Sequence, residues 1–345
     1  MNLDRVFRIP PFIALYSFTH LAVDAACAFL LLGVLELNGH IVLSLILYNA
    51  SAFVLQAPIG FIIDKTLNPK LAALTGLVFV AVSYLFWSNI FAALVIAGVG
   101  NALFHVGGGS MVLSLKSKKA TCSGIFVAPG GIGLALGTYL AASHLHLMLF
   151  PLAILILGFA LCFIKTPVFN RINEREHFAG YGVLLLSMIM VPIIVRSMVG
   201  LSVAFPWKEH PPLLLLLVVA IALGKALGGI LADKYGLKKV GVGGLIASAP
   251  FLAFFPSLPV LGIVGIILFN FTMPVTLIAL FNTIPKYKGL SFGLASTALF
   301  IGSLPILMGK ELSLMNDWIL FSLIILASMI LFAGLRFKNK SLETV

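Results

Sequence analysis

Five ionisable side chains lie within long apolar stretches of this sequence: His20, Asp24, His105, Arg196 and Lys225. A charged side chain at the centre of a bilayer costs about 2.5–3.5 kcal/mol on insertion scales, so each of the five needs a partner or a function. Histidine and aspartate side chains can carry protons, whereas an arginine keeps its charge and binds anions. These residue types therefore indicate proton transfer beside an anion-binding site.

The first pair is local in sequence. His20 and Asp24 are four residues apart, which places them on one face of a helix, one turn from each other. Asp24 lies near the middle of the apolar stretch 11–34. We expect Asp24 to carry a proton, with His20 modulating it. The alternative is a structural pair whose hydrogen bonds never change.

His105 is the second candidate proton carrier. It lies in GNALFHVGGG near the centre of the stretch 89–115, with Asn101 one turn earlier. The glycines that follow allow another helix or a ligand to approach closely, and an unperturbed histidine titrates near about pH 6.5. We expect His105 to act in proton coupling and, with Asn101, in substrate binding. The alternative is a packed histidine that is only hydrogen-bonded.

Arg196 and Lys225 are the candidate anion-binding residues. Arg196 lies in the outer part of the stretch 180–204, and its charge needs a counter-charge. Asp24 is the only acidic residue well inside an apolar stretch, so we expect a charge relation between Asp24 and Arg196 across a central cavity. Alternatively, Arg196 extends to the outer interface and anchors its helix. Lys225 either lines the inner part of the cavity or extends toward the cytoplasm.

The elements that must position these residues follow from composition. Of 345 residues, 61% are hydrophobic and only 10% are charged, with a mean hydropathy of +1.15. A helix needs about 20 apolar residues to cross the hydrocarbon core. The sequence contains twelve such stretches, at 11–34, 40–62, 70–88, 89–115, 121–142, 146–165, 180–204, 212–232, 238–256, 258–284, 289–308 and 316–336. We therefore predict an all-α polytopic membrane protein with twelve transmembrane helices.

The chain also nearly repeats itself after 169 residues. The segment GFIIDK, which ends in Asp64 and Lys65, returns as GGILADK, which ends in Asp233 and Lys234. The same offset pairs Gly60 with Gly229 and Asn101 with Asn270. A duplicated apolar chain is typical of a secondary transporter with its substrate site between the halves. We predict two pseudo-symmetric six-helix bundles, at residues 1–165 and 180–345, joined by a cytoplasmic linker at 166–179.

The charge distribution indicates orientation and excludes a nucleic-acid partner. The net charge is +11, and almost all basic residues lie at chain ends or in loops on one side of the predicted spans. The positive-inside rule makes that side cytoplasmic, together with both termini. The three cysteines have no metal-ligand or disulfide spacing, and no phosphate-binding loop is present. We expect a monomer in the cell membrane, without cofactor or bound metal.

The second copy of the repeated motif carries a resemblance. It reads GGILADKYGLKK and resembles the loop motif of the major facilitator superfamily, in which an Asp and basic residues follow glycines. Asp233 is expected near the N-terminus of a neighbouring helix, where the helix dipole favours a carboxylate. The first copy departs from this pattern, with Asn68 and Pro69 after the basic residue. The expected gating residues are Gly60, Asp64, Lys65, Gly229, Asp233, Lys234, Lys238 and Lys239.

A narrower resemblance involves four segments. They read THLAVDAACAF, GNALFHVGGGS, SGIFVAPGGIGLALG and VRSMVG. They are similar to the fosmidomycin-resistance exporters of the superfamily, which show His-x-x-x-Asp, Phe-His-Pro and Arg-Ser in the first, fourth and seventh helices. Val106 replaces the proline of that pattern, which predicts a straighter fourth helix. The Pro129-Gly130-Gly131 sequence also resembles the antiporter motif of exporters.

The sequence therefore favours proton-coupled export of a small, anionic compound or drug by alternating access. Proton-coupled uptake of a nutrient or organic anion by symport is the main alternative. A membrane-embedded enzyme is disfavoured because no nucleophile–base pair or metal cluster is evident. A sensor is disfavoured because the sequence contains no soluble output domain.

Overall fold

The computed structural model describes residues 10–35, 40–66, 68–115, 117, 119–143, 149–169, 180–309 and 316–343, and every regular element within them is a helix. The N-terminal helices are α2 (Pro11–Leu35), α3 (Ile41–Asn49), η1 (Ala50–Val54), α4 (Gln56–Lys65), α5 (Pro69–Ser83), η2 (Tyr84–Phe86), α6 (Ile90–Leu113), α7 (Lys119–Ala142) and α8 (Leu149–Phe163). The C-terminal helices are α9 (Gly180–Ser202), η3 (Pro206–Glu209), α10 (Pro211–Tyr235), α11 (Leu237–Phe254), α12 (Pro259–Asn270), α13 (Thr272–Thr283), α14 (Lys288–Leu307) and α15 (Asp317–Glu343).

These helices form spans of membrane-crossing length. Within the described residues, eleven are long and apolar enough to cross a membrane, if α3 to α4, α5 with η2, and α12 with α13 each count as one span. The twelfth apolar helix, α8, has 15 residues, and residues 144–148 before it lie outside the described part of the chain. The predicted all-α fold with twelve helices is confirmed, and the chain is a multi-pass membrane protein.

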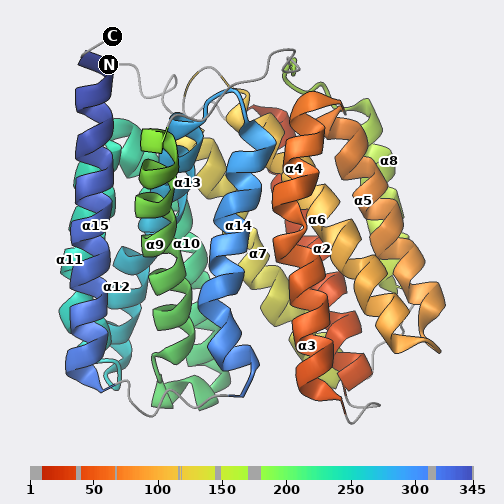
Figure 1. Ribbon diagram of the computed structural model, residues 1–345. Coiled ribbons are helices and arrows are strands. Elements are labelled where there is room, and N and C mark those ends of the chain that lie inside the picture. Colours follow the sequence, from red (N-terminus) through yellow and green to blue (C-terminus); the bar gives the residue numbers. More distant parts are fainter. Residues whose placement is uncertain are drawn as a thin grey trace.

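The 169-residue offset is visible in the helix bounds. Adding 169 to the first residues of α2, α6 and α7 gives 180, 259 and 288, at which α9, α12 and α14 begin. Figure 1 shows α2 to α8 on one side of the molecule and α9 to α15 on the other, with α7 and α14 near the junction. The two halves therefore repeat one arrangement of helices.

Two spans are interrupted within the bundle, which the apolar stretches do not predict. The second span changes from α-helix to π-helix at η1 and back at α4. The tenth span breaks at Phe271 between α12 and α13. Pro274 lies in the first turn of α13, where its missing N–H leaves no helical hydrogen bond unmade. Pro58 occupies the same position in α4, so a proline follows each interruption.

Glycines set the spacing of the helices that carry the candidate site. Gly133 and Gly137 of α7 lie against the backbone carbonyls of Leu21 and Ala25 in α2, where a Cβ atom would collide with them. Small residues permit such close helix approach in membrane bundles. These contacts hold α2 and α7 together at the residues that directly follow His20 and Asp24.

The two halves also approach each other through glycines. Gly60 of α4 lies against the backbone of Gly289 in α14, and Gly229 of α10 lies against the backbone of Ala120 in α7. A Cβ atom on either glycine would overlap the opposing backbone. The halves are therefore in backbone contact where α4 and α10 end and α7 and α14 begin.

Candidate functional site

Three of the five interior ionisable residues meet in the N-terminal half. His20 and Asp24 lie on α2, and His105 lies on α6. The His20 Nε2 atom is 3.2 Å from Asp24 Oδ2, and the His105 Nε2 atom is 3.4 Å from Asp24 Oδ1. The two Nε2 atoms are 2.8 Å apart. We call this set of His20, Asp24 and His105 the triad.

Backbone carbonyls determine which ring nitrogens of the triad face one another. The Nδ1 atom of His20 lies 2.8 Å from the carbonyl oxygen of Phe126, and that of His105 lies 2.8 Å from the carbonyl oxygen of Asn101. A carbonyl only accepts hydrogen bonds, so each Nδ1 carries hydrogen and donates. In neutral imidazoles both Nε2 atoms are then acceptors, and they face each other beside a carboxylate. Two acceptor nitrogens 2.8 Å apart repel each other unless a cation lies between them. One additional proton, shared by the two Nε2 atoms, supplies that cation.

The triad is buried on most sides. His20 is 4% exposed and His105 is 8% exposed, while the Asp24 side chain keeps 21% of its surface. Asn101 donates from Nδ2 to Asp24 Oδ1 at 3.2 Å and to the hydroxyl of Tyr48 at 3.4 Å. Asp24 is therefore the member of the triad that is open to other groups.

The helix α7 packs against the triad at Gly130. A Cβ atom on Gly130 would lie 2.5 Å from Asp24 Oδ2 and 2.6 Å from His20 Nε2, so no side chain fits there. The next residue, Gly131, faces Lys225 instead, and its Cβ position lies 4.0 Å from Lys225 Nζ. Consecutive glycines of α7 thus contact the triad and a cation of the opposite half.

Arg196 is a buried cation without an acidic partner in the described structure. It lies on α9 and is 9% exposed. Its Nη2 atom donates to the sulfur of Met273 at 3.2 Å, and its Nε atom makes no hydrogen bond. The salt bridges of the described residues join Asp24 to the two histidines. The expected relation between Asp24 and Arg196 is therefore not a contact in this conformation, and a buried Arg196 does not match the alternative of a surface anchor.

Lys225 also points into the protein. It lies on α10, and its Nζ atom donates to the backbone carbonyl of Val127 on α7 at 3.4 Å. A lysine that extends to an aqueous interface would not make this contact with the opposite half. Of the two alternatives for Lys225, the contact fits the one in which the ammonium group faces inward.

The repeated aspartates tie each half to the other. Asp64 accepts hydrogen bonds from the N–H groups of Gly289 at 2.8 Å and Leu290 at 2.9 Å, in the first turn of α14. Asp233 accepts from the N–H groups of Thr121 at 2.7 Å and Ala120 at 3.4 Å, in the first turn of α7. We call these two contacts the latch, and the end of the bundle that carries them the latch end. Both carboxylates satisfy otherwise unpaired N–H groups where the helix dipole favours negative charge.

The first copy of the motif forms the more buried half of the latch, although its sequence departs more from the family pattern. Asp64 is fully buried and makes both of its bonds at 2.9 Å or less. Two turns earlier on α4, Gln56 accepts a hydrogen bond from Ser296 of the opposite half at 2.6 Å. The glycine that is missing after Lys65 is therefore not needed for this contact.

Three of the four lysines of the motif lie on aromatic rings at the latch end. The Nζ atom of Lys65 is 4.1 Å from the ring centroid of Phe61, and that of Lys238 is 4.1 Å from that of Phe332. Lys234 lies 4.9 Å from the ring of Tyr235, and Lys239 is exposed. None of these four lysines contacts the latch aspartates through an ion pair in the described residues. The structure thus separates the aspartates, which join the halves, from the lysines beside them.

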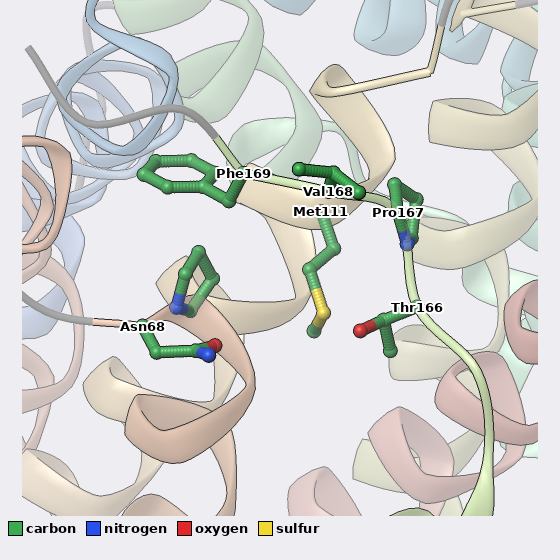
Figure 2. Close-up of a pocket in the computed structure, with 7 residues that line it drawn as sticks. Asn68, Met111, Thr166, Pro167, Val168 and Phe169 are labelled. Atoms are coloured by element: carbon green, nitrogen blue, oxygen red, sulfur yellow. The ribbon is translucent and has the colours of Figure 1, made fainter.

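A cavity of about 260 Å³ lies at the start of α5 and the end of α6 (Figure 2). Its lining residues are Asn68, Pro69, Met111, Thr166, Pro167, Val168 and Phe169. None of the predicted site residues lines it. Asn68 caps α5 there by accepting from the N–H of Lys70 at 2.9 Å. The cavity is thus a feature of the latch end, separate from the triad.

Several contacts of the site could not be predicted from the sequence. The carbonyl partners of the two histidines, Phe126 and Asn101, are backbone groups. Met273 contacts Arg196 from 77 residues away. The Gly130 and Gly131 contacts had a weak signal, because the Pro-Gly-Gly sequence already resembled an exporter motif.

The comparisons with known proteins found similarity in fold. No protein-family model matches the chain, and no curated protein matches it in sequence. The crystal structure of the human organic anion transporter MFSD10 (TETRAN) aligns with a TM-score of 0.67 at 18% identity, covering 94% of this chain and 100% of that one.

Two structures of FucP align similarly. A variant of the E. coli fucose:proton symporter FucP gives a TM-score of 0.68 at 14% identity, covering 95% of this chain and 98% of that one. FucP in an outward conformation, described as a major facilitator superfamily transporter, gives 0.65 at 14% identity with the same coverage. The chain therefore has the major facilitator fold. Its narrower resemblance to the fosmidomycin-resistance exporters stays a prediction.

Proposed function

We propose that this protein is a secondary transporter that exports a small organic anion in exchange for protons by alternating access. The proposed anion site centres on the Arg196 guanidinium, which is buried and has no acidic partner in the described residues. Breaking a buried ion pair costs about 3–5 kcal/mol, because an uncompensated charge remains. An anionic substrate would supply the missing charge.

Lys225 supports the same assignment. Its ammonium group faces inward from the same half as Arg196 and makes one long hydrogen bond, at 3.4 Å, to a backbone carbonyl. Asp24, the interior carboxylate, is already bound by two histidines and Asn101. Arg196 and Lys225 would thus bind the substrate, with Asn101 and His105 at the boundary between the anion site and the triad.

The triad supports coupling to protons. Its two facing Nε2 atoms require a shared cation, and Asp24 is open enough to exchange a proton with its surroundings. Lys225 and the triad face adjacent glycines of α7. Binding of an anion at Lys225 would therefore affect the triad through α7. We therefore assign proton coupling to Asp24, His20 and His105.

Alternating access would proceed by opening the latch. The halves, which we place at residues 1–165 and 180–345, would rock about their interface as paired bundles do in related folds. Asp64 and Asp233 would release the first turns of α14 and α7, and the glycines Gly60 and Gly229 would separate from the opposing backbone. We propose that the latch end is cytoplasmic, as are both termini and the linker 166–179, of which 170–179 lie outside the described residues.

Uptake by proton symport is the second candidate. It uses the same residues, and FucP, which has the same fold, is described as a fucose:proton symporter. The human protein of that fold is described as an organic anion transporter, which agrees better with the buried cations. The partners in either case are a small molecule, protons and lipid, with the protein as a monomer. We propose no enzymatic reaction for this chain.

A ligand screen tests the anion site. Small organic acids, phosphonates and neutral sugars would be compared by the shift in unfolding temperature that each causes in the purified protein. We expect stabilisation by one class of anions and loss of that stabilisation in Arg196→Gln. Lys208→Gln serves as the control, because Lys208 is an exposed cation outside the site. Stabilisation by neutral sugars alone, or an unchanged response of Arg196→Gln, would refute the assignment.

A further inference from the structure

We infer that the triad is also a binding site for a first-row divalent transition-metal ion, with Zn²⁺ the best fit. The ligands would be the Nε2 atoms of His20 and His105 and the carboxylate of Asp24. This site was not expected from the sequence, because His105 is 81 residues from Asp24 and the spacing forms no metal motif. The helices α2 and α6 bring the three together.

The ligand types and distances favour such an ion. One ligand atom from each residue lies within 4.8 Å of the others, and the contacts are 2.8, 3.2 and 3.4 Å. A tetrahedral zinc ion with bonds of about 2.0–2.1 Å separates its ligand atoms by about 3.3–3.4 Å. Each histidine is already near that separation from one Asp24 oxygen, His20 from Oδ2 and His105 from Oδ1. The carboxylate would coordinate through one or both of these oxygens, and the two Nε2 atoms need to part by about 0.5 Å. Two imidazoles and one carboxylate are a ligand set that zinc and its neighbours accept.

Both histidine rings are already held in place by hydrogen bonds on the side away from the triad. Both Nδ1 atoms donate to backbone carbonyls at 2.8 Å, which is the partner that a metal-bound histidine usually has. These bonds fix both rings with the Nε2 lone pair directed at the triad. Asn101 donates to the Asp24 oxygen that lies nearer His105. The outer partners that orient metal ligands are therefore present before any ion binds.

The charge of the three ligand groups and the exposure of Asp24 also favour binding of a metal ion. The three ligand atoms supply one negative charge and two neutral acceptors, an arrangement that needs a cation in its centre. The partly exposed Asp24 carboxylate provides an entry path, while both histidines are buried. A metal would use the same lone pairs as the shared proton, so the two exclude each other. Given the proposed function, Zn²⁺ would therefore stop proton-coupled transport while leaving Arg196 and Lys225 unoccupied.

The test is direct binding of Co²⁺ to tag-free purified protein, followed by its absorption spectrum and by displacement with Zn²⁺. We expect one bound ion with the intense visible bands of a low-symmetry site, and at least about tenfold weaker binding in His20→Gln and His105→Gln, the loss typical of even an outer-shell partner. His210→Gln is the matched control, because His210 is an exposed histidine away from the triad. Correct folding of each variant is checked by its unfolding temperature.

X-ray absorption of the zinc-bound wild-type protein does not depend on the variants. It should show two imidazole nitrogens and no sulfur in the first shell. Absence of stoichiometric binding to folded wild-type protein, unchanged affinity in folded His20→Gln and His105→Gln, or a sulfur ligand would each overturn the inference. Because these measurements need no transport, they are independent of whether the proposed export is found.

Discussion

Asp24→Asn is expected to abolish transport driven by a pH gradient while leaving exchange of substrate across the membrane. The amide keeps the size of the carboxylate and its hydrogen bond from Asn101, but it cannot take up a proton. It also removes the negative charge that two histidines contact at 3.2 and 3.4 Å. Anion binding at Arg196 and Lys225 does not need that charge, so the carrier should still alternate when loaded on both sides.

Proteoliposomes allow both modes to be measured for the anion that stabilises the protein best. Gradient-driven uptake should fall to the level of empty vesicles, and exchange should stay within about twofold of wild type. Undiminished gradient-driven transport by Asp24→Asn would show that the triad does not carry the coupling proton.

Adjacent glycine variants provide a matched control for the same result. In Gly130→Ala the added methyl group would lie 2.5 Å from Asp24 Oδ2 and 2.6 Å from His20 Nε2, which displaces the triad. In Gly131→Ala the nearest atom is the Ile221 Cγ2 atom at 3.8 Å, an ordinary contact. Coupled transport should be impaired by the first change and retained after the second.

Asp64→Asn is expected to open the latch. The carboxylate is fully buried and accepts from two N–H groups at the start of α14. Hydrogen bonds to a charged group contribute about 1.5–3 kcal/mol each. Loss of one such contribution would shift the balance between the closed and open latch by roughly ten- to hundredfold. The latch end should therefore be open in a much larger fraction of molecules.

Cys122 serves as a reporter for this opening. It lies on α7, in the other arm of the latch, and is 2% exposed. In a Cys27→Ser, Cys162→Ser background, Asp64→Asn should accelerate maleimide labelling of Cys122 in the purified protein. Asp317→Asn, an exposed acid outside the latch, should not. Because Asp64 contacts α14 and not α7, equal labelling rates in both variants would contradict concerted rocking of the halves.

The helices of this fold were predictable from the sequence because a membrane imposes length and apolarity on each span. The stretch 11–34 became α2 at Pro11–Leu35, and the 169-residue offset reappeared in the first residues of α9, α12 and α14. The break at Phe271 and the π-helix at Ala50–Val54 were not predicted, since both stretches are apolar enough over their whole length to be counted as single spans. Hydropathy reports that a segment crosses the bilayer but not how its backbone bends within it.

The site was predictable only where it is local. The four-residue spacing of His20 and Asp24 specifies their contact, and both are neighbours in the structure. The contact of His105 with both depends on how α6 packs against α2, which no pattern in one sequence reveals. Similarly, the expectation that Asp24 faces Arg196 assumed that opposite charges in the interior must pair. Here His20 and His105, and not Arg196, are the residues that contact Asp24.

In the proposed transport cycle, a proton held by the triad is exchanged for an anion held by Arg196 and Lys225. The most direct measurement is the change in free proton concentration when the stabilising anion is added to weakly buffered purified protein, followed with a pH-indicator dye. We predict proton release by wild-type protein and none by Asp24→Asn, because export by exchange requires anion and proton to exclude each other. Proton uptake would instead indicate symport. Absence of any change in wild type, or an identical change in Asp24→Asn, would contradict exchange of the anion for a proton of the triad.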